Sequence, residues 1–144
     1  MIETPPLPEL DADTRPFWES ACRGELAIQA CGSCGRLRHP PRPMCPYCRS
    51  LDVTWQTMSG NATVWSFVVP HPPLLPAFQP YAPYNVCIVA LDEDPLIRVV
   101  GNLIADAGAP INSVDPTSIV IGEPVQVVFE QVADDVALPR FVRR

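Results

Sequence analysis

The feature that most constrains the fold of this sequence is a pair of Cys-x2-Cys motifs, Cys31–Cys34 and Cys45–Cys48, separated by ten residues. Four thiolates at this spacing form a tetrahedral zinc site of the structural type, which leaves no coordination position for a substrate. Two disulfides are the alternative for the pairs, and iron would also suit four cysteine ligands. We therefore expect Cys31, Cys34, Cys45 and Cys48 to bind one structural Zn²⁺ ion and to take no part in catalysis.

The remaining composition predicts a protein of the cytoplasm. The N-terminal stretch is acidic and broken by prolines, and it lacks the basic and apolar regions of a secretory signal. The longest apolar runs have the length of strands, so we expect no contact with a membrane. A reducing compartment favours metal binding over disulfide formation for the two cysteine pairs.

The side chains of this sequence are poorly suited to independent catalysis. The 144 residues include no lysine, which excludes Schiff-base chemistry within this chain. The two histidines, His39 and His71, have no nucleophile motif beside them. We expect the chain to be non-catalytic by itself.

The pattern along the chain predicts a mainly β protein in three parts. Residues 1–25 form a lead-in and a short amphipathic helix from about 14 to 23. Residues 26–52 form a zinc ribbon of two hairpins that carry the cysteine pairs. Residues 53–144 contain five or six short strands, which favours a Greek-key barrel of the OB type with an apolar-basic C-terminal tail. Gly101 interrupts one strand, and we expect a β-bulge there.

Apolar side chains gather in segments that do not look like ordinary surface. The segment 70–83 has six prolines among fourteen residues, so it stays extended and pairs poorly with a strand. We expect this loop, the helix and the C-terminal tail to face a partner or a substrate; ordinary packing between ribbon, helix and barrel is the alternative. The candidate residues are Phe17, Trp18, His71, Leu74, Leu75, Phe78, Tyr81, Arg140 and Phe141.

An ordered series of motifs runs from about residue 14 to residue 141. It starts with Phe17-Trp18 and Arg23-Gly-Glu-Leu26 and continues as Cys31-x2-Cys34-Gly-Arg-Leu-Arg-His-Pro-Pro-Arg-Pro-x-Cys45-Pro-x-Cys48. The later motifs are Ser59-Gly60, Val64-Trp-Ser-Phe67, Pro83-Tyr84, Leu91-Asp-Glu93, Gly122, Pro124-Val125 and Leu138-Pro-Arg-Phe141. This series resembles the DUF35 family. The resemblance implies a helical hook, a rubredoxin-like zinc ribbon and a C-terminal OB fold.

The resemblance also implies a function. DUF35 proteins are similar to accessory subunits or domains of thiolase-fold and hydratase enzymes that act on acyl-CoA, and in the thiolase-type complexes the partner holds the reactive residues. We therefore expect a hetero-oligomer in which this chain docks on a thiolase-like partner of the SCP2-thiolase type, with acyl-CoA at the interface. The first expectation is retro-aldol cleavage of a side-chain β-hydroxyacyl-CoA, as in steroid degradation. Acyl transfer and a MaoC-type hydratase complex are the alternatives.

Positive charge is concentrated in the predicted ribbon. Residues 31–50 hold four arginines and no acid, although the whole chain has a net charge of −6. Arg36, Arg38 and Arg42 are candidates for contact with coenzyme A phosphates or with an acidic partner, and a solvated ribbon surface is the alternative. The barrel has little cationic surface beside its aromatic residues, so we expect no nucleic-acid partner; an OB-fold nucleic-acid module is the weaker alternative function.

The predicted metal site leads to a direct test. Replacing one ligand, Cys45→Ala, should abolish the single equivalent of bound metal, because three thiolates no longer complete a structural zinc site. Native mass spectrometry of the purified protein measures the metal content. An unchanged metal content would contradict the four-cysteine site.

Overall fold

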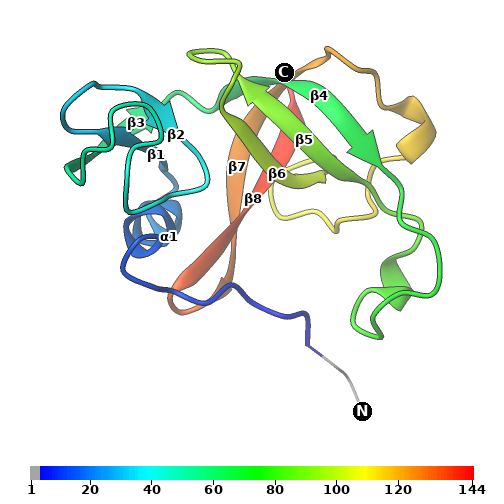
Figure 1. Cartoon of the computed structure of the whole chain (residues 1–144). Helices are drawn as coiled ribbons and strands as arrows, with labels where there is room; N and C mark the ends of the chain where they lie inside the picture. Colours follow the sequence, from blue (N-terminus) through cyan, green and yellow to red (C-terminus); the bar gives the residue numbers. More distant parts are fainter. Residues whose placement is uncertain (1–3) are drawn as a thin grey trace.

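The computed structural model describes residues 4–144, so the first three residues of the predicted lead-in lie outside the described part. Strands dominate the described chain, with one short α-helix, as expected. A small sheet and the helix lie on one side of a larger barrel, and the proline-rich loop projects from the other side (Figure 1). The predicted architecture of helix, ribbon and OB-type barrel is therefore confirmed.

The helix α1 (Arg15–Cys22) begins after a turn that is closed by Asp11. The Asp11 carboxylate accepts hydrogen bonds from the Thr14 N–H at 2.8 Å and the Thr14 hydroxyl at 3.0 Å. Thr14 occupies the N-cap position, but its side chain caps no helical N–H group. The buried face of α1 includes Phe17 and Ala21, and it packs against β1 and β8.

The ribbon contains a three-stranded sheet with the order β2-β1-β3, formed by β1 (Leu26–Cys31), β2 (Leu37–Arg38) and β3 (Val53–Met58). All six residues of β1 are buried. β3 pairs with the whole length of β1, from Leu26↔Met58 to Cys31↔Val53. Residues 53–58 fall within the segment predicted to form the barrel, whereas the structure pairs them with the ribbon. A strand pattern defines which face is buried and does not define the neighbouring strand.

Five strands close into the barrel: β4 (Asn61–Val68), β5 (Val86–Leu91), β6 (Arg98–Leu103), β7 (Pro124–Ala133) and β8 (Val136–Arg143). Their order is β4-β5-β6-β8-β7, and only the β6–β8 pair is parallel. This is the strand order of the five-stranded Greek-key barrel of an OB fold. The expected C-terminal tail is therefore strand β8. It closes the barrel, and for this reason Phe141 is completely buried instead of facing a partner.

Gly101 lies at a close approach between two strands. A Cβ atom at this position would lie 2.6 Å from the Pro139 carbonyl oxygen and 3.1 Å from the Phe141 ring. The pairing of β5 with β6 runs from Ala90↔Arg98 to Cys87↔Gly101, where it ends, without a shift in register, so these strands show no bulge at Gly101. The register shifts instead in β4, between Val64 and Ser66.

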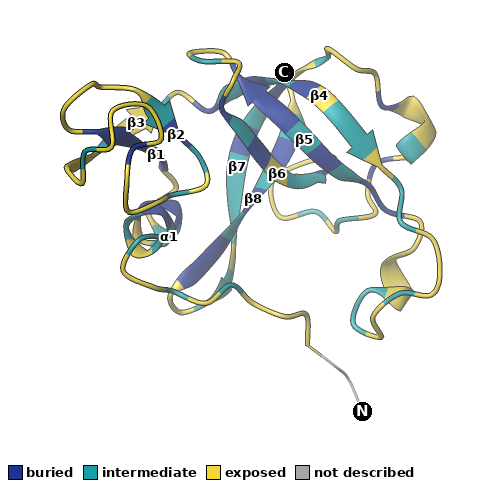
Figure 2. Ribbon diagram, viewed as in Figure 1, coloured by how far each residue is buried: buried dark blue, intermediate teal, exposed yellow. Residues whose placement is uncertain are grey.

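One hydrophobic core joins all three parts of the described chain. Phe17 from α1 and Ile28 from β1 belong to the same buried cluster as Val89, Leu103 and Phe141 from the barrel. Figure 2 shows buried positions along β1 and along the barrel strands, while the connecting loops are largely exposed. The ribbon and the barrel therefore share a core and do not pack as two separate domains.

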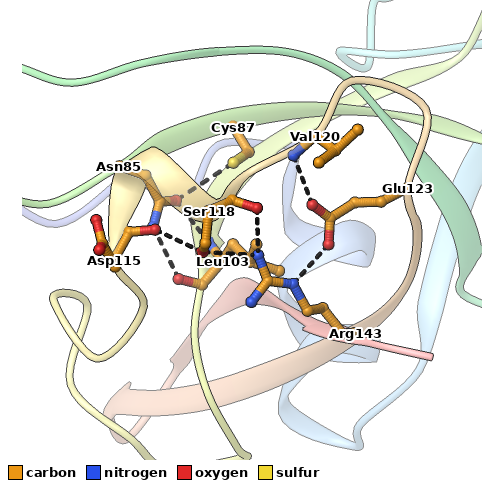
Figure 3. Close-up of polar contacts among 8 residues, drawn as sticks. All are labelled: Asn85, Cys87, Leu103, Asp115, Ser118, Val120, Glu123 and Arg143. Atoms are coloured by element: carbon orange, nitrogen blue, oxygen red, sulfur yellow. Dashed lines mark hydrogen bonds and ion pairs between the residues drawn. The ribbon is translucent and has the colours of Figure 1, made fainter.

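Polar contacts fix the end of β6, and the long segment between β6 and β7, to the barrel. The Asn85 side chain, which is fully buried, donates to the Leu103 carbonyl at 2.9 Å and accepts from the Leu103 N–H at 2.7 Å (Figure 3). Arg143 donates to the Glu123 carboxylate at 2.6 Å and to the Ser118 hydroxyl at 3.0 Å. The Asn85 amide thus replaces a strand neighbour for both backbone groups of Leu103.

Replacing Asn85 with alanine should lower the free energy of unfolding by about 2–4 kcal/mol, because it leaves a buried N–H and a buried carbonyl without partners. Asn112→Ala, at an exposed loop position, is the matched control and should change stability by less than about 0.5 kcal/mol. Urea unfolding followed by circular dichroism measures both values. Equal stability of the two variants would contradict this role for Asn85.

Candidate metal centre and interaction surface

The four predicted cysteine ligands come together at the tip of the ribbon. Their sulfur atoms all lie within 4.8 Å of one another. Cys31 Sγ is 3.5 Å from Cys48 Sγ, and Cys34 Sγ is 3.7 Å from Cys45 Sγ. Sulfur atoms around tetrahedral zinc lie about 3.8 Å apart, because each Zn–S bond is about 2.3 Å long. All four are free thiols, so the disulfide alternative is wrong, and the sulfur geometry fits a metal ion.

Backbone N–H groups favour the thiolate form of two of these residues, Cys31 and Cys45. The N–H groups of Cys34 and Ser33 donate to Cys31 Sγ at 3.4 Å and 3.3 Å and lower the pKa of Cys31 to about 6. The Cys48 and Tyr47 N–H groups likewise lower the pKa of Cys45. Thiolate, and not thiol, is the form that binds a metal ion. The turn geometry therefore favours the metal-binding form at Cys31 and Cys45, whereas the pKa of Cys48 is raised to about 11.

Polar contacts behind the sulfurs join the two cysteine knuckles. Ser33 Oγ lies 2.8 Å from Ser50 Oγ and donates to the Asp52 carboxylate at 3.3 Å. The Gly32 N–H donates to the Asp52 carbonyl at 2.8 Å. Such outer contacts fix the orientation of metal ligands. The second knuckle is thereby held against the first by the protein itself.

Outside the metal centre, three adjoining hollows follow strand β6 from its C-terminal end to the turn before it. Numbered from the C-terminal end of β6, the first and second hollows share Val100 and Gly101 in their linings. The second and third hollows share His39 and Pro40. We call the three hollows together the β6 trough. It brings the lead-in, the helix, the ribbon and the proline-rich loop to one face of the barrel.

The first hollow, the aromatic groove, has a volume of about 1050 Å³. Phe78 and Tyr81 from the proline-rich loop line it, together with Leu7 from the lead-in and Arg140 from β8. The Phe78 and Tyr84 rings lie 5.9 Å apart, and Tyr84 is buried, so the loop is anchored on the barrel at this point. Arg140 is paired with Glu130 at 2.9 Å.

The second hollow, the helix pocket, is smaller, at about 430 Å³, and mainly apolar. Trp18 from α1, Pro40 from the ribbon and Val100 from β6 line it. The ring of Phe17 also lines this pocket, but the residue is only 4% exposed and packs edge-to-face on Trp18 at 4.9 Å. Phe17 is therefore chiefly a core residue, whereas Trp18 is only partly buried.

The third hollow, the arginine pocket, lies between the ribbon and the turn before β6 and measures about 520 Å³. It brings together the three predicted arginines, Arg36, Arg38 and Arg42. Arg38 is buried and donates to Gln29 Oε1 at 2.6 Å and to the Arg42 carbonyl at 3.1 Å. The Arg36 guanidinium lies 4.2 Å above the ring of Tyr47.

Some of the residues predicted to face a partner or a substrate therefore line the trough, and others do not. Trp18, Phe78, Tyr81 and Arg140 line it, and His71, Leu74 and Leu75 do not. His71 and Leu75 are exposed elsewhere on the proline-rich loop. These placements reflect which loops fold back onto the barrel, which a pattern within one loop does not reveal.

Several residues of the trough carried no signal in the sequence. Leu7 comes from a lead-in that had no predicted role, and Ile111 from a loop between strands. Tyr47 does carry a signal, since it lies within the second Cys-x2-Cys motif beside the basic segment. Arg98, which lines the helix pocket, stacks over the Trp65 ring at 3.6 Å.

Comparison with protein families agrees with this architecture. Residues 18–54 match the rubredoxin-like zinc ribbon domain of ChsH2, and residues 55–130 match the C-terminal OB-fold domain of ChsH2. A DUF35 domain-containing scaffold protein of Methanothermobacter thermautotrophicus is 32% identical over 114 residues, which cover 78% of this chain and 77% of that protein. The chain belongs to the DUF35 family.

Two longer relatives of this DUF35 chain are named as hydratase subunits. A probable enoyl-CoA hydratase alpha subunit of Thermomonospora curvata is 38% identical over 94% of this chain. The 3-oxo-4,17-pregnadiene-20-carboxyl-CoA hydratase alpha subunit of Mycobacterium tuberculosis is 33% identical over 88% of it. The chain spans only 39% and 37% of these two relatives, so it corresponds to one part of each.

Solved structures show the same fold. A chain of the Ltp2-ChsH2(DUF35) aldolase superposes with a TM-score of 0.80 at 35% identity, over 95% of this DUF35 chain and 98% of that chain. A DUF35 protein of unknown function from Sulfolobus solfataricus superposes with a TM-score of 0.60 at 12% identity. Within residues 4–144 there is no helix of the length and apolarity that a membrane span requires.

His39, at the border of the helix pocket and the arginine pocket, should make stability depend on pH. Burial lowers the pKa of His39 to about 4, and its Nδ1 has no hydrogen-bond partner in the described chain. Because the unfolded histidine titrates near 6.5, the folded state is the weaker proton acceptor. The stability is complete above about pH 6.5 and falls by about 1 kcal/mol per unit as the pH drops toward 4.

His39→Leu should reduce this loss between pH 7 and pH 5.5. Thermal unfolding at each pH measures it, with zinc retention followed in parallel so that metal loss is not mistaken for histidine titration. His71→Leu, at an exposed position, is the control and should leave the wild-type pH dependence unchanged. The same pH dependence in the His39 variant as in the wild type would contradict the assignment.

Proposed function

We propose that this chain is a non-catalytic, zinc-binding accessory subunit that docks on a thiolase-fold partner and completes an acyl-CoA-processing complex. The principal support is the extent of similarity to the Ltp2-ChsH2(DUF35) aldolase, of which the matched chain is covered to 98%. The hydratase alpha subunits are covered to only 39% and 37%. An aldolase complex is therefore the first candidate, acting on a side-chain β-hydroxyacyl-CoA of the kind met in steroid degradation.

The metal in this proposal is zinc with a structural role. Four cysteine thiols at tetrahedral spacing complete the coordination shell, so the ion has no open position for a substrate. Their free state fits a reducing compartment such as the cytoplasm. The ion contributes to folding, and the reacting groups belong to the partner.

The β6 trough is the proposed docking surface. It is open, largely apolar along its first two hollows, and lined by Trp18, Phe78, Tyr81 and Val100. Val100 is 55% exposed and lies where the aromatic groove meets the helix pocket. Aromatic residues in such hollows are the usual centres of stable protein interfaces. The acyl-CoA of the complex would then lie beside this surface.

A MaoC-type hydratase complex is the second candidate, because two relatives are named as hydratase alpha subunits. In each of them the matched region is joined to a longer remainder, since the match covers less than two fifths of the protein. The docking surface would serve the same purpose, with a hydratase in place of the thiolase-fold partner. The choice between the two depends on which partner the chain retains.

A charge in the middle of the trough should prevent docking. When the chain and a thiolase-fold subunit of the same organism are co-expressed, the wild type should co-elute with it, whereas Val100→Glu should weaken association by roughly tenfold or more, because the carboxylate would be desolvated at the interface. Val68→Glu is the matched control, since Val68 is a strand residue of similar exposure (61%) outside the trough.

Size-exclusion chromatography and calorimetric titration measure this association. Separate elution of the wild-type chain from the thiolase-fold subunit, together with full activity of that subunit alone, would contradict the proposal. Retention by a MaoC-type hydratase instead would favour the second candidate. Turnover of a thioester by the isolated chain would contradict its non-catalytic role.

A further inference from the structure

The arginine pocket carries positive charge that the protein leaves unneutralised. Four ion pairs occur in residues 4–144, and their cations are Arg23, Arg140, Arg143 and Arg144. None of them involves an arginine of the pocket. Asp94, the one acid on the rim, has a carboxylate oxygen that accepts from the Leu96 N–H at 3.1 Å. In a chain with sixteen acids and a net charge of −6, this leaves an unusual local excess of cations.

Arg38 is the most constrained of these cations. It is only 6% exposed, and its Nε and Nη2 atoms are held by Gln29 and by the Arg42 carbonyl. Its Nη1 atom is buried and has no partner in the described chain. Burying a guanidinium without a carboxylate is costly unless an anion compensates it. Arg38 therefore holds a fixed positive charge in the wall of the pocket. Arg36 and Arg42 are exposed and can contact a ligand.

An aromatic surface stands beside these cations. Tyr47 is 59% exposed, and the Arg36 guanidinium lies over its ring at 4.2 Å. A stacked tyrosine and guanidinium present the flat surface on which a nucleobase binds. Arginine forks pair with phosphate oxygens in a bidentate manner. A pocket of about 520 Å³ is large enough for a base and its phosphates, and a single partner carboxylate would leave most of it empty.

We propose that the arginine pocket binds the phosphate-bearing adenine nucleotide end of a coenzyme A thioester, with the phosphates on Arg36 and Arg42 and the base on Tyr47. The identity of the whole ligand rests on the proposed function. The order of the trough agrees with it, because the charged pocket adjoins the apolar helix pocket, with His39 and Pro40 in the lining of both. The nucleotide end would thus be held at the charged edge of the docking surface, and the acyl end would extend toward the partner that covers the apolar hollows.

Calorimetric titration of the zinc-loaded full chain with adenosine 3′,5′-bisphosphate tests the pocket, with inorganic phosphate and adenosine as separate probes. The bisphosphate should bind, and inorganic phosphate and adenosine should each bind more weakly. Arg42→Gln should weaken the bisphosphate by roughly tenfold, and Tyr47→Leu by roughly three- to tenfold. Arg49→Gln, which removes an exposed ribbon arginine outside the pocket, should leave affinity within about twofold.

Three outcomes would overturn the inference: no binding of the bisphosphate by the folded, zinc-loaded chain, equal losses in Arg42→Gln and Arg49→Gln, or equal affinity for bisphosphate and inorganic phosphate. Zinc content and circular dichroism show that each variant is folded, and Arg36→Gln provides a second variant if Arg42→Gln is unstable.

Association with the partner is measured for the same variants, which separates this inference from the proposed function. Loss of partner binding in Arg42→Gln, with no binding of the bisphosphate to the wild type, would assign the pocket to a partner carboxylate and overturn the inference alone. Failure of the wild type to bind any partner would contradict the proposed function, while the bisphosphate titration would still decide the pocket.

Discussion

The close approach of four cysteine sulfurs is the constraint on which the rest of this structure depends. The two sulfur pairs hold together the ends of a segment that contains Arg36, Arg38 and His39, and this segment forms one wall of the β6 trough. The first pair also begins where β1 ends, and Ile28 of β1 is part of the core that continues into the barrel. A metal ion bound by these sulfurs would thus stabilise the wall of the trough that lies between its ligands in the chain.

Charge and apolar surface are concentrated in different parts of this small protein. Its barrel is acidic overall, and its arginines near the C-terminus are neutralised by Glu123, Glu130 and Asp92. The ribbon arginines are not, and they lie at one end of a trough whose other end is aromatic. Such a gradient suits a ligand or a partner that is charged at one end and apolar at the other.

The relatives show how such a unit is used in different proteins. The same ribbon and barrel form about two fifths of two proteins named as hydratase subunits and nearly the whole of a chain in an aldolase. The shared core of ribbon, helix and barrel explains why the unit is kept together, since dividing it would expose Phe17 and Ile28.

Patterns of nearby residues predict the local structure and the four cysteines that cluster. The spacing of Cys31 to Cys48, the helix around Phe17 and the alternation of the barrel strands are set by short-range geometry, which a pattern of residues records. The tertiary structure decided which distant segments meet. It paired β3 with β1, made the C-terminal segment a barrel strand that buries Phe141, and brought Tyr47 beside the turn before β6. These contacts join residues far apart in the chain, and their energies depend on three-dimensional packing that no local pattern contains.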